Sequence, residues 1–211
     1  MIQLAFAALM LASIPAAAET GVSEKEITIG ACFDLEGPNK SNGIAYMNGA
    51  SAYFKWLNDE KKGVHGRKIN LIFDDDSFNA DKGILCFKKL IEQGIFAGGF
   101  VGGTPLAAKY IPMAEKAGLP LVGFNTGAQF LFEPFKKHIF AARASYFDEG
   151  AYMVKRLYED LGIRKFAAIY QFDAFGASGL ESVKHGLKSY PDAALVSSES
   201  LQLKGSTDAD Y

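Results

Sequence analysis

One short segment combines residue types that suit an anion. Gly102, Gly103, Thr104 and Pro105 follow an apolar run and precede an amphipathic stretch. Glycine lets a ligand approach the backbone, and the N–H groups at a helix start favour negative charge, so the segment fits a carboxylate as well as a phosphate. It also fits a tight strand-to-helix turn, with Thr104 as N-cap and Pro105 at the first helical position. It is not a P-loop, because the glycine spacing and the Lys-Ser/Thr pair are missing.

Two further polar segments also end predicted strands. The carbonyl and hydroxyl groups of residues 125–127 (Asn-Thr-Gly) suit an ammonium group, or simply keep a loop soluble. Residues 171–176 (QFDAFG) mix one carboxylate with aromatic rings, a combination that suits a small zwitterion. Phe172 fits a core position, whereas Asp173 and Phe175 fit positions that face a cleft.

The remaining reactive residues form no assembled centre. Three consecutive carboxylates, Asp74 to Asp76, point in different directions along a chain, and no EF-hand spacing follows. We therefore expect Asp76 or Ser77 to cap the next helix rather than bind a metal. Ser178 lacks the nucleophile-elbow pattern, and the histidines have neither catalytic partners nor metal-ligand spacing. The sequence predicts no enzyme, no metal site and no cofactor.

The two cysteines fall on different predicted elements, Cys32 on the first strand and Cys86 on the second helix. Export from the cytoplasm would permit a disulfide. Cys86 lies off the helix face formed by Ile84, Phe87 and Ile91, so we expect the thiols to stay apart, with a bridge as the open alternative.

Short apolar runs alternate with amphipathic stretches along most of the chain. Predicted strands cover residues 26–33, 68–73, 95–101, 119–124, 138–142, 165–170 and 193–201, with helices at about 44–58, around 84–91, up to about 116, and around 151–161 and 180–187. This alternation predicts parallel βαβ units, in which ligands bind beyond the carboxyl ends of the strands. Residues 125–137 are irregular and lead to a predicted domain boundary near Ala144.

Composition and the first residues bound the class of protein. The chain has 211 residues, 49% apolar and 22% charged, with net charge −2, which excludes disorder and offers no basic face for nucleic acid. Leu4–Ile14 is an apolar run of signal-peptide length, followed by Pro15 and by the small residues Ala16 and Ala18. The n-region lacks Lys and Arg, and a buried N-terminal helix is the alternative. We place cleavage after Ala18 and expect a soluble periplasmic protein.

These motifs together resemble a type I periplasmic binding protein. The residues that carry the resemblance are EITIG, GVHGRKINLIFDD, GGFVGGTP, GLPLVGFNTG, HIFAARASYFDEG and KFAAIYQFDAFGASGLESVKHGLK. The match is closest to the branched-chain amino-acid (leucine/isoleucine/valine) receptors of ABC transporters. It implies an α/β fold of Rossmann-like lobes, each a parallel sheet with helices on both faces.

The resemblance also implies a function and a ligand set. It predicts an extracytoplasmic receptor that captures an amino acid, of the branched-chain type or a similar small carboxylate, and delivers it to the permease subunits of an ABC importer. The alternative is the ligand-sensing domain of a chemoreceptor or regulator. By position, the carboxylate group binds at Gly102, Gly103 and Thr104 with Phe100 or Val101 alongside, the amino group at Asn125, Thr126 and Gly127, and the second lobe adds Tyr146 and Phe175.

The sequence departs from this family in composition and in length. Glu36 and the pair Gly102 and Gly103 stand where the family usually has threonine and serines. After a signal peptide at 1–18 and a first lobe at 24–144, residues 145–211 make only part of a second lobe. We therefore expect a truncated receptor with an incomplete second lobe.

The export segment makes the first testable prediction. If signal peptidase cleaves after Ala18, mass spectrometry of the secreted protein will show a mature N-terminus at Glu19. A soluble cytoplasmic product that retains Met1 would contradict the prediction.

Overall fold

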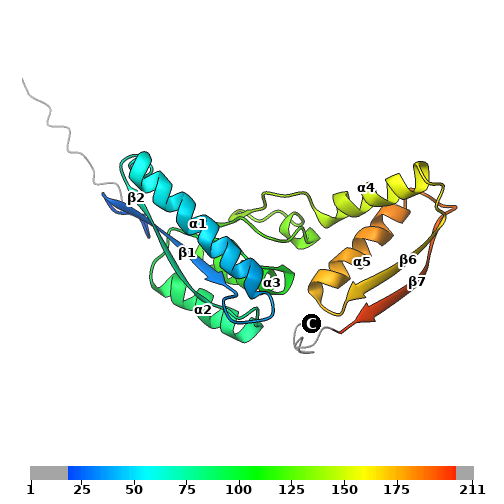
Figure 1. Cartoon of the computed structure of the whole chain (residues 1–211), viewed down its shortest axis with the longest axis horizontal. Helices are drawn as coiled ribbons and strands as arrows, with labels where there is room; N and C mark the ends of the chain where they lie inside the picture. The colour runs from blue at the N-terminus through cyan, green and yellow to red at the C-terminus, as the bar shows by residue number, and fades with distance from the viewer. Residues whose placement is uncertain (1–18, 203–211) are drawn as a thin grey trace, which may run out of the picture.

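The computed structural model describes residues 19–202, which form two α/β lobes (Figure 1). The predicted signal segment lies outside the described residues, as do residues 203–211. The first lobe holds five strands, three α-helices and a short 3₁₀ helix at Gln129–Leu131, and the second holds two α-helices and two strands. The chain passes from one lobe to the other after β5, near the predicted boundary at Ala144.

All five strands of the first lobe are parallel. Their order across the sheet is β2-β1-β3-β4-β5, with β1 at Glu26–Phe33, β2 at Lys68–Asp75, β3 at Ala97–Gly99, β4 at Leu121–Val122 and β5 at Ile139–Phe140. The register aligns Phe33 with Asp75, so β1 and β2 end side by side. This order confirms the predicted parallel α/β fold.

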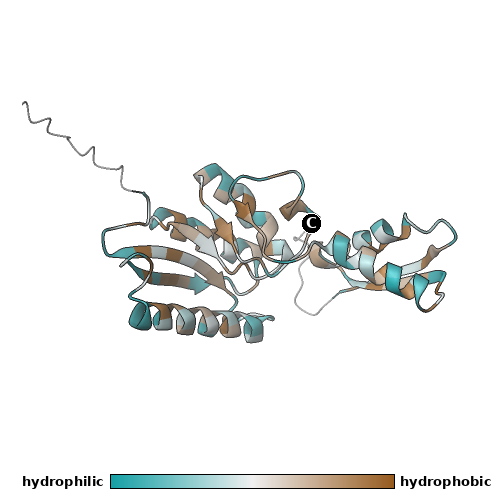
Figure 2. Cartoon of the chain, turned by 90° about the horizontal axis from the view of Figure 1, so that it is seen from above, coloured by the Kyte–Doolittle hydropathy of each residue, from teal (hydrophilic) through white to brown (hydrophobic). Residues whose placement is uncertain are grey.

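Helices cover both faces of this sheet. Successive strand residues point to opposite faces. Cys32 faces α2 (Ala80–Glu92) and α3 (Thr104–Ala117), whereas Phe33 contacts Phe73 and Phe100 on the face covered by α1 (Lys40–Glu60). The main core lies on the side of α2 and α3. It includes Phe87, Leu90, Ile95, Leu106, Tyr110 and Leu121. Figure 2 shows hydrophobic residues along both the strands and the helices of this lobe.

A disulfide joins Cys32 of β1 to Cys86 of α2, so the expectation of separate thiols was wrong. The buried face of α2 is formed by Gly83, Cys86, Phe87 and Leu90, with Ile84 only half-buried. These residues follow the i, i+3, i+4, i+7 spacing of a helix that packs on a sheet. The face predicted from Ile84, Phe87 and Ile91 is rotated about the helix axis relative to the buried face. The prediction therefore placed Cys86 away from the sheet, although it faces Cys32.

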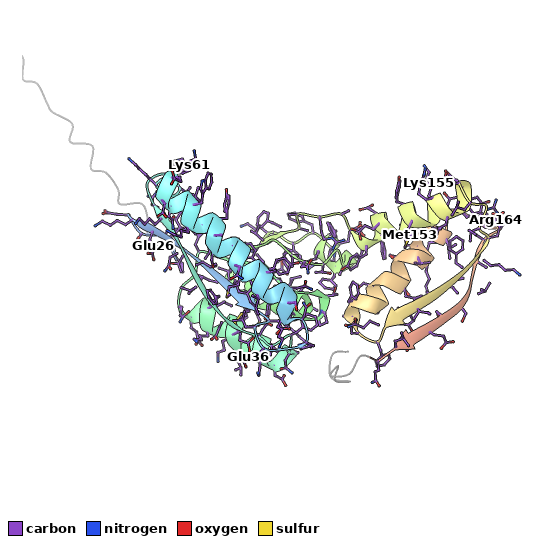
Figure 3. All side chains as sticks on the ribbon, viewed as in Figure 1. Glu26, Glu36, Lys61, Met153, Lys155 and Arg164 are labelled. Atoms are coloured by element: carbon purple, nitrogen blue, oxygen red, sulfur yellow. A yellow bond between two sulfur atoms is a disulfide. The ribbon has the colours of Figure 1, made fainter. Side chains whose placement is uncertain are left out.

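The second lobe contains α4 (Tyr146–Glu159), β6 (Lys165–Gln171), α5 (Ala174–Leu187) and β7 (Ala194–Leu201). The two strands are parallel, and α4 packs on α5 at Gly150 and Gly186. The far end of this lobe is closed by Arg164, which bonds to Asp192 and lies over the ring of Tyr158 (Figure 3). One face of its sheet stays open among the described residues, with Ile169 76% exposed and Val196 59% exposed.

Strands β3, β4 and β5 are shorter than predicted, and the backbone conformation explains where β3 and β4 end. The structure restricts β3 to Ala97–Gly99 because Phe100 takes a positive φ of 59°, which breaks the ladder. Likewise β4 ends at Val122, because Gly123 has a φ of 76°. Within residues 19–202, no helix is both long enough and apolar enough to cross a membrane.

The disulfide makes a stability prediction. The bridge spans a sequence separation of 54 residues, and a cross-link of that length typically contributes about 2–4 kcal/mol. We expect the double variant Cys32→Ala, Cys86→Ala to lose about that much of the free energy of unfolding of the first lobe. Trp56, the single tryptophan of the chain, lies on α1 and reports this lobe by fluorescence in urea. An unchanged urea midpoint would refute the prediction, and reduction of the wild-type protein is the control.

Candidate functional site

The strand ends of the two lobes face each other. Figure 1 shows the arrowheads of β1, β6 and β7 directed toward the space between the lobes. Because ligands of parallel sheets bind beyond the carboxyl ends of the strands, we expect the site in the loops that follow these strands.

The loop between β3 and α3 presents free backbone donors. Among residues 19–202, the N–H groups of Gly102, Gly103 and Thr104 have no hydrogen-bond partner, and they stand at the start of a 14-residue helix. We call these three residues the anion cradle. The N-cap is Gly103, with Thr104 first in the helix and Pro105 second, so the predicted capping register was off by one residue. The cradle therefore offers N–H groups and the positive end of a helix dipole to a negative charge.

The two residues before the cradle have different places. The side chain of Val101 is buried in the core, and its carbonyl accepts the Asn125 N–H at 2.9 Å, so this residue joins the two loops from within. Phe100 is half-buried and packs on Phe33 and on Phe54 of α1. The positive φ of Phe100 turns the chain out of β3 toward the cradle.

A hydrogen bond between two buried hydroxyls links the cradle to the next loop. The Oγ1 atoms of Thr104 and Thr126 lie 2.7 Å apart, and Thr126 Oγ1 also accepts the Ala128 N–H at 3.2 Å. Two hydroxyls hold two protons, and their mutual bond uses one of them. The pair thus keeps one hydroxyl proton, which no other described residue accepts.

The loop of residues 125–127 contacts the crossing into the second lobe. Asn125 is exposed, and the Gly127 carbonyl accepts the Tyr146 N–H at 2.6 Å. A Cβ at Gly127 would lie 2.6 Å from the Ala144 carbonyl oxygen, so this approach requires glycine. The loop and the start of α4 form one connected unit.

The two aromatic residues expected from the second lobe lie together. The rings of Tyr146 and Phe175 meet edge to face, with centroids 5.9 Å apart. Phe175 is 48% exposed and Tyr146 only 8%, so Phe175 presents the larger free surface. The Arg143 guanidinium lies 5.2 Å from the centre of the Tyr146 ring and pairs with Glu149.

Two acidic residues differ from their expected roles. Asn79 caps α2, so Asp76 and Ser77 do not cap it as predicted. Asp76 is instead fully buried, where its Oδ1 accepts the Phe78 N–H and its Oδ2 accepts the Tyr110 hydroxyl at 3.1 Å. Asp173, placed by the sequence pattern at a cleft, is buried and caps α5 through the Gly176 N–H. Both carboxylates bond to backbone that follows them in the chain, as short acidic side chains commonly do.

Burial and hydrogen bonding change the pKa values of Asp75, Asp76 and Tyr110. Loss of water raises the pKa of Asp76 to about 6, and the neighbouring carboxylates of Asp34 and Asp75 add to the rise. The same burial, with the charge of Asp76 beside it, raises the pKa of the Tyr110 hydroxyl. Hydrogen bonds from Ser77 and Leu35 outweigh burial at Asp75, whose pKa is lowered.

A small cavity lies between the cradle and these carboxylates. It admits the centre of about one water molecule, with a volume near 10 Å³. Its lining includes Asp34, Asp76, Phe78, Phe100 and Gly102. The carboxylate of Asp34 accepts the N–H groups of Gly37 and Asn39, which shapes the loop before α1. Glu36 projects from that loop and is exposed (Figure 3).

The sequence pattern placed Gly102, Gly103 and Thr104 at the start of a helix, as observed, but did not reveal the buried acidic residues behind them. Glycines after a strand signal a close approach directly, whereas consecutive aspartates do not show which one is buried. No group of three His, Cys, Asp or Glu side chains in residues 19–202 is arranged to hold a metal ion.

Comparisons with known proteins show the family and the fold of the chain. The sequence model of a family described as periplasmic binding protein matches residues 26–210. A substrate-binding periplasmic protein from Ralstonia solanacearum superposes with a TM-score of 0.75 at 28% identity, over 84% of this chain and 50% of that one. No curated protein sequence matches.

Two further solved structures, each described with a ligand or substrate, share the fold at lower sequence identity. One is a fatty acid ABC transporter substrate-binding protein from Thermomonospora curvata, with a TM-score of 0.72 and 21% identity over 88% of this chain and 46% of that one. The other is the branched-chain amino acid substrate-binding protein LivJ from Streptococcus pneumoniae in complex with isoleucine, with a TM-score of 0.70 and 21% identity over 87% and 51%. The chain spans about half the length of the solved structures it matches.

The two glycines of the cradle make a matched pair for mutagenesis. Gly103 has a φ of 143°, and a Cβ there would lie 2.7 Å from Cε2 of Phe78, whereas a Cβ at Gly102 would meet nothing within 4 Å. We expect Gly103→Ala to lower the free energy of unfolding by about 1–3 kcal/mol, because it combines strain with a clash. Gly102→Ala should change it by less than about 0.5 kcal/mol. Equal urea midpoints for the two variants would contradict this description of the cradle.

Proposed function

The chain belongs to the periplasmic binding protein family, and on that basis we propose that it is the ligand-capturing part of an extracytoplasmic receptor for an ABC importer. Its ligand is an amino acid, of the branched-chain type or a similar small carboxylate. Its partners are the permease subunits that receive that ligand. Binding rather than catalysis is the activity of this family.

The observation that carries the proposal is the anion cradle. Three N–H groups without partners among the described residues stand at the start of α3. Backbone donors of this kind bind a carboxylate through charge-assisted hydrogen bonds, and the helix dipole adds to the attraction. The spare hydroxyl proton of the Thr104–Thr126 pair supplies a further donor at the same place.

The aromatic residues support an apolar portion of the ligand. Phe175 is half-exposed at the start of α5, next to Tyr146, and the strand ends of both lobes face the same space (Figure 1). Two of the similar proteins are titled for fatty acid and for isoleucine, ligands that share a carboxylate and an apolar chain. The exposed amide of Asn125 provides an acceptor for an ammonium group, which would distinguish an amino acid from a fatty acid.

A titration observed by NMR tests the proposed function. L-isoleucine added to the ¹⁵N-labelled chain should shift the amide signals of Gly102, Gly103 and Thr104. Isoamylamine, which lacks the carboxylate, should leave them in place. If none of these signals moves with L-isoleucine or with hexanoate, the proposed ligand class is wrong.

Thr104 makes the residue-level prediction. Thr104→Val removes a charge-assisted donor worth about 1.5–3 kcal/mol, so the affinity for L-isoleucine should fall roughly ten- to hundredfold. Thr104→Ser keeps the hydroxyl and should stay within about threefold of the wild type. Unchanged affinity in a well-folded Thr104→Val variant would show that the hydroxyl only joins the two loops.

A further inference from the structure

The turn between β2 and α2 is held in an uncommon backbone conformation. Ser77 and Phe78 have φ values of 49° and 51°, the left-handed region that residues other than glycine seldom occupy. Such a conformation persists only where the surroundings determine it, and it is typical of functional sites. Two such residues in succession indicate that the position of Phe78 matters.

Two aspartates hold this turn. The Oδ1 atom of Asp75 accepts the N–H groups of Leu35 at 2.7 Å and Ser77 at 3.0 Å, and its Oδ2 accepts the Ser77 hydroxyl. The Oδ1 atom of Asp76 accepts the Phe78 N–H at 2.9 Å, and its carbonyl accepts the Asn79 N–H at 2.9 Å. The conformation of the turn thus depends on side chains within it.

The turn lies directly against the anion cradle. The ring of Phe78 occupies the space where a Cβ of Gly103 would lie. Phe78 and Asp76 also line the one-water cavity together with Gly102. A movement of the turn would therefore shift the Phe78 ring that packs against Gly103 of the cradle.

Asp76 also bonds to the helix that carries the cradle. Its Oδ2 accepts the hydroxyl of Tyr110, which lies on α3 in the buried core. Asp76 consequently connects the strained turn and α3 through its two oxygens. Among the described residues it is the only side chain that bonds to both.

We propose that Asp76 is a positioning residue of the anion cradle and that its protonation is coupled to the affinity of the cradle for a carboxylate. The part that concerns affinity rests on the proposed function. The titratable groups around Asp76 are Asp34 after β1, Tyr46 on α1, Asp75 at the end of β2 and Tyr110 on α3. Lys82 of α2 hydrogen-bonds the hydroxyl of Ser77, the next residue of the turn.

The sign of the coupling follows from charge. Below the raised pKa of about 6, Asp76 is neutral, and above it a full negative charge faces the cavity that Gly102 also lines. A bound carboxylate is repelled by that charge, so affinity falls as the pH rises through 6. Linkage requires the reverse effect as well, so a bound carboxylate raises the pKa of Asp76 further. The contribution to folding has the same direction, because a raised carboxyl pKa favours the folded state at low pH and this advantage is lost between pH 4 and 6.

The test uses the ¹⁵N-labelled 211-residue chain and its Asp76→Asn variant. Asparagine keeps the shape, accepts the Phe78 N–H and donates to the Tyr110 oxygen, but stays neutral at every pH. Asp81→Asn, at an exposed position of α2, is the matched control. Without ligand, the amide shifts of Gly102, Gly103 and Phe78 should titrate near pH 6 in the wild type and in Asp81→Asn, and should not titrate there in Asp76→Asn.

The second arm measures the affinity for L-isoleucine, whose carboxylate is ionised at both pH 5 and pH 7.5. Wild type should bind about three- to tenfold more tightly at pH 5, and Asp76→Asn should bind equally at both. Tyr110→Phe, which removes a hydrogen bond that favours the ionised form, should move the amide midpoint upward. That shift tests the proposal independently if Asp76→Asn does not fold.

The coupling of Asp76 to the cradle and the proposed ligand can fail independently of each other. Cradle amides that titrate alike in wild type and Asp76→Asn would overturn the coupling, because a group other than Asp76 would then cause the pH dependence. A pH-dependent affinity that persists in Asp76→Asn would overturn it as well. If the cradle amides follow Asp76 but L-isoleucine shifts none of them, the coupling stands and the proposed ligand is wrong.

Discussion

The site depends on one hydrogen bond, that between the buried hydroxyls of Thr104 and Thr126. It joins the ends of β3 and β4, strands that pair over only a few residues and would otherwise separate soon after they leave the sheet. The carbonyl of Val101 strengthens this connection by accepting the Asn125 N–H. Because both threonines are buried, the bond forms in a medium of low dielectric constant, and within the cradle Gly102 and Gly103 keep part of their surface exposed.

The rest of the site is arranged in shells around this bond. Next to the cradle stands Phe78, and behind Phe78 stand the carboxylates that hold its turn. The disulfide of Cys32 fixes α2 to β1 and so fixes the far side of the same turn. Backbone donors that would attract an anion thus line the same small cavity as two buried carboxylates. The protein resolves this conflict by giving those carboxylates their own backbone and hydroxyl donors.

Sequence patterns predicted the elements well and the buried polar contacts poorly. The strand at Glu26–Phe33 was predicted with its observed bounds, because charged residues flank its apolar run on both sides and mark its ends. Local spacing also located Gly102, Gly103 and Thr104 correctly at the start of a helix. The face of α2 was misjudged, because Cys86 and Ile84 are both apolar and only the packing decides between them. The roles of Asp76 and Asp173 depend on which carboxylate the tertiary structure buries, and nothing local in the chain specifies that.

The bond between the Gly127 carbonyl and the Tyr146 N–H has a mechanical consequence. It holds the first residue of α4 beside the loop of residues 125–127, while Arg164 lies at the opposite end of the second lobe. A helix of 14 residues is about 21 Å long, so a rotation of α4 by roughly 10° about its first residue would move its other end by about 4 Å. Such a rotation would displace Tyr146 and Phe175, which lie close to this bond, far less than the outer end of α4.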